Sequence, residues 1–537
     1  MRRLSLILAL ALTFATFTTV NAAIPKSGGS CAKKGLVSIY KNKKYTCIKS
    51  GNKFIWDSGF AFQPKNPAPL PSISSSAVPT PSNSPTTQPS ATPTGPKTGD
   101  ICANIGSRFE ISKTSFLECR MVAKNQSQWI ILNLNPVLPT NNVSLGNIKD
   151  CQVSDQTNRS RFDAQAAPIG YMPDRRQSLS YPTQGNFNIV ILPIDFKDFP
   201  GSGLDESELL NYSKIIETWF NYESNGKLKV SVSYVNKWLR APKLSHDYNW
   251  NHPGTQNPTS LSDDQIGQDF ADIADNYVDF HNVGAIFVMH PDRIPNIEYG
   301  MMANTKIQTS EGFVSPFLVS NGYNVDRQDG AIWSYWIHEL GHHLGFVGHA
   351  PDELRDLDLM DNQSGFGLAT STWNQLLVDW LLPTQLYCRS IGNLISDNVT
   401  LTSVDSLSDG VKSAMIAMSS HEVLVIESRR KDFWTTASNT FVKMKKEAFD
   451  GFYGIAVYLV DTSKINDPNI DRMSPQFDPS IHKFARYLTI SNEHLSRYKD
   501  VEGLEYLMFL GESIIFRNVK ISLVNTGDFD TIKIEKI

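Results

Sequence analysis

The sequence has almost no net charge and, after its first residues, no long apolar run. Lys and Arg number 50 against 54 Asp and Glu, which leaves a formal net charge of −4 over 537 residues. A balance this close to neutral gives no basis for binding nucleic acid or an anionic membrane surface. No later stretch approaches the roughly 20 apolar residues that a membrane-spanning helix needs. We therefore expect no nucleic-acid partner and no membrane span.

Cysteine is also scarce, and the N-terminus indicates how the six cysteines are used. Arg2 and Arg3 precede an apolar run that ends near Phe17, and Val-Asn-Ala at 20–22 fits a small-residue cleavage site. No cysteine stands at the cleavage point to carry a lipid. We expect residues 1–22 to be a signal peptide and the protein to be secreted or extracellular, with cell-surface association as an option. In that compartment the cysteines are expected to form disulfides.

Two short N-terminal segments, 24–60 and 97–132, repeat each other. The matched positions are Gly28 with Gly99, Cys31 with Cys102, Gly35 with Gly106, Cys47 with Cys119, and Trp56 with Trp129. Segments this short do not hold a core without a cross-link, so we predict the disulfides Cys31–Cys47 and Cys102–Cys119. Two roles stay open: a module that binds cell wall, carbohydrate or protein, or a spacer.

The rest of the chain divides by composition and periodicity. Residues 63–96 consist almost entirely of Pro, Ser, Thr, Ala and Asn, as in an extended, semi-rigid linker. Over 150–390, strand-type and helix-type patterns alternate, which predicts an α/β (α+β) domain. From 391 to 537, short strand-type runs are separated by turn residues, which predicts a β-rich domain of sandwich type. That domain is either an accessory binding module or a cover for its neighbour.

A histidine motif lies in the α/β region, where residues 336–349 read Trp-Ile-His-Glu-Leu-Gly-His-His-Leu-Gly-Phe-Val-Gly-His. His338 and His342 are four residues apart, so on a helix both imidazoles project toward one point. This spacing, with Glu339 beside the first histidine, is typical of zinc peptidases whose glutamate is the general base for metal-bound water. We predict His338 and His342 as zinc ligands and Glu339 as the catalytic residue. The alternative is a helix that carries these residues by chance.

A third ligand is expected after the helix. Gly345 can adopt the left-handed conformation that ends a helix and turns the chain back toward the metal. His349 is the nearest suitable side chain after that turn. The metzincin version of the motif places its third ligand at the position of Gly348, which has no side chain. Asp352 and Glu353 are the alternative third ligands.

An acidic run follows, with Asp352, Glu353, Asp356, Asp358 and Asp361 around Leu-Met at 359–360. Clustered carboxylates suit calcium, but their spacing is not that of a calcium-binding loop, and a solvated acidic loop is the favoured interpretation. The methionine either packs beneath the metal or is an ordinary core residue.

Cys151 and Cys388 bracket the α/β region, and we expect one disulfide between them. In the alternative, Cys151 ligates the metal and holds an enzyme latent, which would leave Cys388 unpaired.

Several motifs in the same order resemble the immune inhibitor A family of secreted bacterial metallopeptidases. They span roughly residues 185–465: Asp-Phe-Lys-Asp at 195–198, Trp-Phe and Gly-Lys-Leu-Lys-Val at 219–230, the histidine motif, Asp-Leu-Met-Asp at 358–361, Val-Asp-Trp-Leu at 378–381, and strand-type runs at 422–430 and 454–461. The resemblance implies a zincin-like catalytic domain, with His338 and His342 as ligands and Glu339 as base. At Gly348 the sequence departs from the family, where an acidic ligand is expected.

The expected function is that of a zinc endopeptidase acting on extracellular proteins or peptides, with one catalytic zinc ion and a surface ligand for the repeats. A competing hypothesis is an exported binding or adhesion protein that retains a degenerate peptidase fold. The repeats, the linker and the irregular third ligand favour this alternative. The intact His338-Glu339-His342 group opposes it, because a protein without catalysis has no physical need for Glu339.

Overall fold

A computed structural model describes most of the chain beyond its N-terminal region. The predicted signal peptide 1–22 and nearly all of the predicted linker 63–96 lie outside the described residues, as do Cys31 and the acidic residues at 352, 353 and 356. None of the described helices has the length and apolar character needed to cross a bilayer. The described residues are 26–30, 37–40, 43–50, 53–56, 60–61, 95–102, 108–112, 115–123, 126–133, 137–139, 141–156, 168–172, 181–250, 261–291, 294–297, 302–322, 332–347, 349, 358–363, 367–404, 406, 409–430, 453–464, 478, 480, 483–498 and 504–537.

The chain forms two compact units, Met1–Ala91 and Thr92–Ile537. The first contains a small antiparallel sheet in which Cys47 lies opposite Trp56, and the N–H of Gly28 donates to the Trp56 carbonyl over 2.8 Å. Its strands are β1 (Val37–Tyr40), β2 (Lys43–Ser50), β3 (Lys53–Trp56) and β4 (Phe60–Ala61). Because Cys31 is outside the described residues, the pair Cys31–Cys47 stays a prediction.

The second unit begins with a three-stranded sheet that repeats these local pairings. Cys119 lies opposite Trp129, and the N–H of Gly99 donates to the Trp129 carbonyl over 2.8 Å. A disulfide joins Cys102 to Cys119, as expected from the sequence. The strands are β5 (Arg108–Ser112), β6 (Ser115–Ala123) and β7 (Gln126–Asn133).

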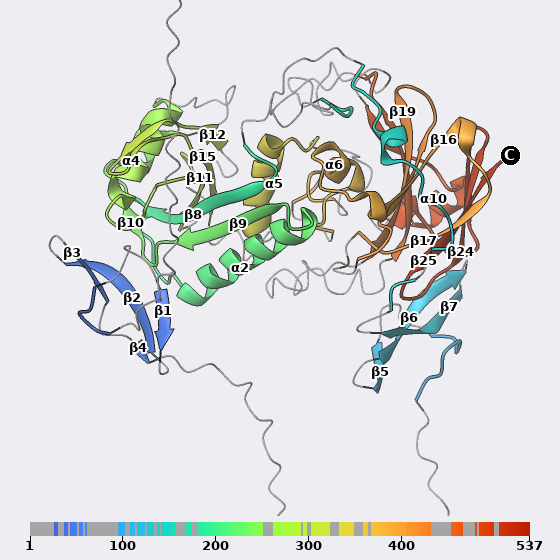
Figure 1. Ribbon diagram of the computed structural model, residues 1–537, viewed down its shortest axis with the longest axis horizontal. Coiled ribbons are helices and arrows are strands. Elements are labelled where there is room, and N and C mark those ends of the chain that lie inside the picture. Colours follow the sequence, from blue (N-terminus) through green and yellow to red (C-terminus); the bar gives the residue numbers. More distant parts are fainter. Residues whose placement is uncertain are drawn as a thin grey trace, which may run out of the picture. The chain divides into compact units, whose positions relative to one another are not determined.

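A six-stranded sheet forms the centre of the α/β region (Figure 1). Its strand order is β10-β8-β11-β15-β12, with β9 also paired to β8, and all pairs are parallel except β12 with β15. The strands are β8 (Gly185–Asp195), β9 (Leu228–Tyr234), β10 (Leu239–Arg240), β11 (Val283–His290), β12 (Met302–Asn304) and β15 (Phe317–Gly322), and a hairpin of β13 (Ile307–Thr309) and β14 (Gly312–Val314) lies beside α4. Strand-type apolar runs of the sequence form β8, β9 and β11, in line with the pattern described over 150–390.

Helices cover both faces of this sheet because β8 is apolar on both sides. Ile189 and Ile191 belong to the core that includes α2 (Glu206–Glu223) and α5 (Ile332–Leu344). Val190 and Leu192 belong to the opposite core, with α4 (Asp263–Ala274) and the short helix α3 (Ser245–Tyr248). This alternation follows from the two-residue period of a strand.

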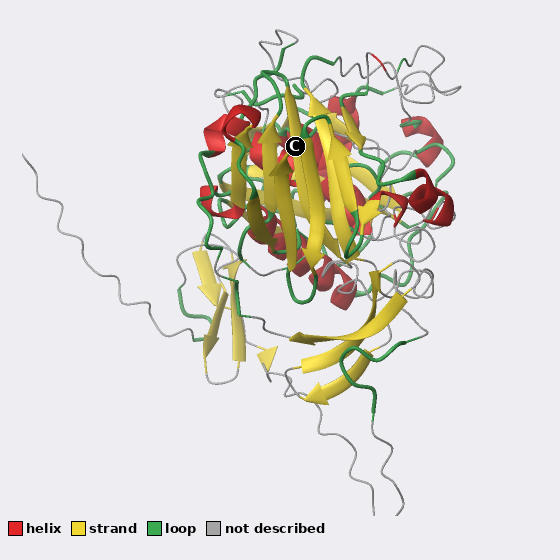
Figure 2. Cartoon of the chain, turned by 90° about the vertical axis from the view of Figure 1, so that its right-hand side faces the viewer, coloured by secondary structure: helices red, strands yellow, loops and turns green. Residues whose placement is uncertain are grey.

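A further core lies between two other sheets, as in a β-sandwich (Figure 2). One sheet has the order β16-β18-β19-β20-β21, with β22 also paired to β20, and the other has the order β17-β25-β24-β23. Their strands are β16 (Leu386–Ser390), β17 (Asp397–Leu401), β18 (Ser413–Ala417), β19 (Glu422–Arg430), β20 (Tyr453–Asp461), β21 (Ala485–Tyr487), β22 (Leu507–Met508), β23 (Ser513–Phe516), β24 (Val519–Asn525) and β25 (Asp530–Lys536), and the helix α10 (Asn492–Tyr498) precedes β22.

Two segments of the predicted 150–390 domain belong to the packing of this second region. The helix α6 (Thr372–Leu377) packs through Trp373 and Leu376 against residues of β19 and β20. Cys151 and Cys388 form a disulfide with a Cα–Cα distance of 6.1 Å, as expected, which overturns the alternative that Cys151 ligates a metal. The helix α6 ends at Leu377, and Asp379, two residues later, has a left-handed backbone with φ +59°.

Candidate metal centre

The helix α5 carries the histidine motif and is largely buried. Its apolar residues Trp336, Ile337 and Leu340 are fully buried in the core beneath the central sheet. The helix ends at Leu344, and Gly345 follows with φ +98°. The N–H of Phe346 donates to the carbonyl of Gly341, and that of Gly345 to the carbonyl of His342, the hydrogen-bond pattern of a Schellman motif. The predicted turn at the glycine is therefore present.

His338 and His342 converge from adjacent turns of α5. Their Nε2 atoms are 3.3 Å apart. Two imidazole nitrogens at this distance either share a proton or face a common cation. In a tetrahedral zinc site with Zn–N distances of about 2.05 Å, two ligand nitrogens are about 3.3 Å apart. The spacing therefore fits a metal ion without any movement of the two rings.

A backbone carbonyl sets the tautomer of His338. Its Nδ1 lies 2.7 Å from the carbonyl oxygen of Leu359. A carbonyl only accepts, so Nδ1 carries the proton, and in the neutral ring Nε2 is left with its lone pair toward His342. Metal-binding histidines are commonly oriented in this way by a second hydrogen bond.

His349 completes the group from beyond the helix. One ring nitrogen from each of His338, His342 and His349 lies within 4.8 Å of the others, and this trio could hold a metal ion. The backbone of His349 is left-handed, with φ +56°, and its N–H donates to the carbonyl of Met360 over 2.8 Å. Gly348 and the alternative ligands Asp352 and Glu353 lie outside the described residues, so those alternatives stay untested.

The electrostatics of the site favour neutral histidines. Burial, followed by repulsion from His349, lowers the pKa of His338 to about 3, against the opposing effect of the Leu359 hydrogen bond. Burial and the neighbouring histidines also lower the pKa of His342 well below its ordinary value. Burial raises the pKa of Glu339 from 4.5 to about 8. At neutral pH the lone pairs of both helical histidines are therefore available to a cation.

Met360 packs beneath the motif. Its side chain is fully buried, and a Cβ added at Gly341 would lie 2.8 Å from the Met360 sulfur. Glycine at this helical position therefore allows the 358–361 segment to lie against α5. Among the described residues, the three histidines are the group of metal-ligating side chains close enough to share an ion. The described part of the acidic run, Asp358 and Asp361, forms no such group.

Sequence reasoning missed the contacts that support this trio. Asn374 of α6 accepts a hydrogen bond from the N–H of Val347 (2.8 Å) and donates to its carbonyl (3.3 Å). Asp358 accepts from the N–H of Met360 over 2.8 Å and lies 3.7 Å from the Arg429 guanidinium. No local pattern indicates these contacts, because they join segments far apart in the sequence.

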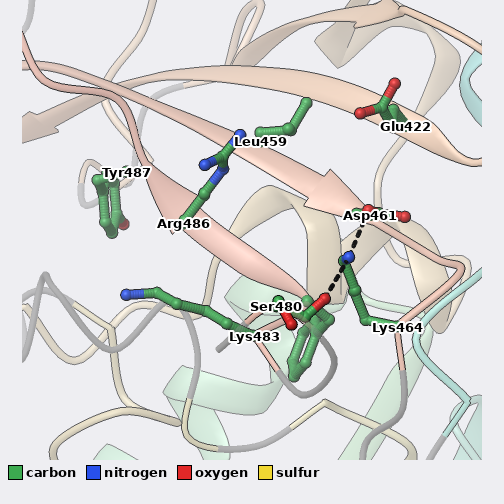
Figure 3. A pocket seen from close by; sticks show the side chains of 9 residues that line it. Glu422, Leu459, Asp461, Lys464, Ser480, Lys483, Arg486 and Tyr487 are labelled. Atoms are coloured by element: carbon green, nitrogen blue, oxygen red, sulfur yellow. Dashed lines mark hydrogen bonds and ion pairs between the residues drawn. The ribbon is translucent and has the colours of Figure 1, made fainter. Parts of the chain in front are cut away.

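A separate cavity of about 520 Å³ opens beside β20 and β21 (Figure 3). Its charges are largely paired, since Asp461 lies 3.6 Å from Lys464, and Glu422 lies 2.7 Å from Arg517. The cavity contains none of the three histidines. The residues that line it are Glu422, Leu459, Asp461, Lys464, Ser480, Lys483, Phe484, Arg486 and Tyr487.

Comparisons with known proteins add little to this geometry. No family model matches the chain, and no curated protein matches it. Among solved structures, metalloproteinase-II from Bacteroides fragilis aligns at 12% sequence identity, covering 50% of this chain and 78% of that one, with a TM-score of 0.20. At this TM-score a common fold is not demonstrated, and function has to be inferred from the site itself.

Proposed function

We propose that this protein is a secreted zinc endopeptidase, with a zincin-like catalytic domain of the immune inhibitor A type, that hydrolyses peptide bonds of extracellular proteins. The 3.3 Å separation of the His338 and His342 Nε2 atoms, with His349 close by, is the observation that carries the proposal. Three imidazole nitrogens with a fourth position left to water are a donor set that suits catalytic zinc.

His338, His342 and His349 would hold the ion. When bound, zinc supplies a water molecule with a pKa near 7 and polarises the carbonyl of the scissile bond. The Leu359 carbonyl holds the His338 ring in place, so its Nε2 is presented before the ion arrives. The low pKa of His338 means that no proton has to leave the ring near neutral pH.

Glu339 is the proposed general base. It follows His338 on α5 and is partly exposed. Burial alone raises its pKa to about 8, and the positive charge of a bound dication would lower that value. A carboxylate tuned toward neutral pH accepts a proton from the attacking water and returns it to the leaving amine.

The proposal is tested by metal content and proteolysis in purified full-length protein. We expect about one zinc per chain, and hydrolysis of casein that a chelator abolishes and added zinc restores. Glu339→Gln removes the base but keeps the side-chain shape, so it should retain zinc and lose at least about 100-fold in kcat. His349→Ala should lose zinc.

Each contrary result has a distinct meaning. A wild type that takes up no zinc even in excess metal would refute the metal centre. Full zinc without hydrolysis of any protein substrate would favour the binding or adhesion protein. Full zinc in His349→Ala would transfer the third-ligand role to another residue, of which Asp352 and Glu353 are the candidates.

A further inference from the structure

Two charged side chains of the C-terminal sheet extend toward the segments that carry the histidines. Glu427 and Arg429 alternate along β19 with Ser428 and Arg430, so they share the face that packs on α6. Both side chains are fully buried, with 0% exposure. Buried charges are costly unless they are paired, and each of these two has partners outside its own strand.

Glu427 holds the first turn of α6. One of its carboxylate oxygens accepts from the N–H and the hydroxyl of Thr372, over 2.7 and 2.6 Å. Two residues later, the side chain of Asn374 forms hydrogen bonds with both the N–H and the carbonyl of Val347. Val347 precedes His349 by two residues. A chain of short contacts therefore runs from β19 through α6 to the segment that presents His349.

Arg429 holds the segment 358–361. Its guanidinium lies 2.8 Å from Glu427 and 3.7 Å from the carboxylate of Asp358. The other oxygen of Asp358 accepts from the N–H of Met360 over 2.8 Å, which shapes the turn. The carbonyls of this turn then contact the motif: that of Leu359 orients His338, and that of Met360 accepts from the N–H of His349.

We propose that Glu427 and Arg429 are positioning residues of the metal centre, so that the C-terminal sheet holds His349 and orients His338. This inference rests on the proposed metal-binding function. His349 is exposed and has a left-handed backbone, and the carbonyl that accepts from its N–H belongs to Met360, outside α5. Ordering such a ligand before the metal binds removes conformational entropy that binding would otherwise have to offset.

Arg430 provides a matched control for Arg429. It is the next residue of β19 but points to the opposite face, where its guanidinium lies 2.9 Å from the buried Asp530. Removing either arginine leaves a buried carboxylate without a charged partner, so both substitutions weaken the fold. Only Arg429 is connected to the histidines.

The test compares full-length Arg429→Met and Arg430→Met. Zinc affinity is measured by competition with a chromogenic chelator, and ligand geometry by the visible absorption of the cobalt-substituted protein. We expect Arg429→Met to bind zinc about 10- to 100-fold more weakly, the usual loss when a group supporting a ligand is removed, and to alter the cobalt spectrum. Arg430→Met should keep the wild-type affinity and spectrum even where its unfolding temperature falls.

A second pair of variants leaves every buried charge in place. Asn374→Ala breaks the contacts to Val347, whereas Gln375→Ala, at the next position of α6, breaks a 2.8 Å hydrogen bond to Glu223 instead. We expect about a 10-fold loss of zinc affinity for Asn374→Ala and none for Gln375→Ala. If Arg429→Met does not fold, this pair decides the question.

The outcomes separate this inference from the proposed function. Wild-type zinc affinity and cobalt spectrum in folded Arg429→Met and Asn374→Ala would overturn the positioning role and leave the peptidase proposal intact. Equal losses in the control variants would also overturn it, because the effect would then be one of general stability. A wild type that binds no zinc would overturn both.

Discussion

His290 is expected to make the folded protein sensitive to mild acid. It ends β11 with its side chain 3% exposed, and its Nδ1 lies 3.2 Å from the Ile194 carbonyl. Aromatic rings surround it, with the Phe196 ring 5.4 Å and the Phe270 ring 6.3 Å away between centroids. Burial in these apolar surroundings lowers the pKa of His290 from 6.5 to about 4.

The sign of the effect follows from which state binds the proton. Between pH 6.5 and about 4 the unfolded chain holds a proton on this histidine and the folded chain does not. The free energy of unfolding therefore falls as the pH falls through this window, and changes no further through this group below it. A pKa difference of about 2.5 corresponds to a total loss of about 3 kcal/mol.

The assay is urea unfolding of wild type and His290→Leu at about pH 7.5, 5.5 and 4, with a chelator present. All other titrating groups are common to both proteins, so their contributions cancel in the difference between the two free energies. That difference should shift by about 3 kcal/mol in favour of the variant between the highest and lowest pH. A difference that is the same at all three pH values would refute the reasoning.

Two further predictions concern the packing of Met360 against α5 and the disulfide between Cys151 and Cys388. Gly341→Ala should destabilise the protein by about 1–3 kcal/mol and weaken zinc binding, because the added Cβ would lie 2.8 Å from the Met360 sulfur. Gly527→Ala, where nothing lies within 4 Å, should change neither quantity, and equal effects at both glycines would contradict the packing argument. Replacing Cys151 and Cys388 by Ser should lower the free energy of unfolding by up to about 5 kcal/mol, since their disulfide closes a loop with a sequence separation of 237. An unchanged urea midpoint would show that the linked segments stay together without the bond.

Most of the regular structure around the site follows from local patterns. Ser262 caps α4 and Gln265 completes the capping box, and α2 begins after Asp205, whose side chain accepts from the N–H of Ser207. Such caps and the period of apolar residues act within a few residues, so they can be recognised in the sequence. Short strands such as β18 and β25 are harder to recognise, because neighbours in the sheet, more than local sequence, decide whether short apolar runs pair.

Local sequence patterns are least informative about the role of the C-terminal region. From sequence it is an accessory module or a cover, and no residue in it suggests chemistry. In the structure, Glu427 and Arg429 reach Thr372 and Asp358 from β19. A lone Glu or Arg in a strand pattern gives no sign of such a partner, because the partner is specified only when the chain has folded.

The sequence by itself determined the helix that carries His338, Glu339 and His342, and the glycine turn that ends it. Hydrogen bonds between neighbouring turns and the conformational freedom of Gly345 depend on few residues and need no tertiary contact. The tertiary structure alone decided which tautomer of His338 is held and where His349 lies. The Leu359 and Met360 carbonyls that control both come from a later segment, and long-range packing, not local spacing, brings that segment to α5.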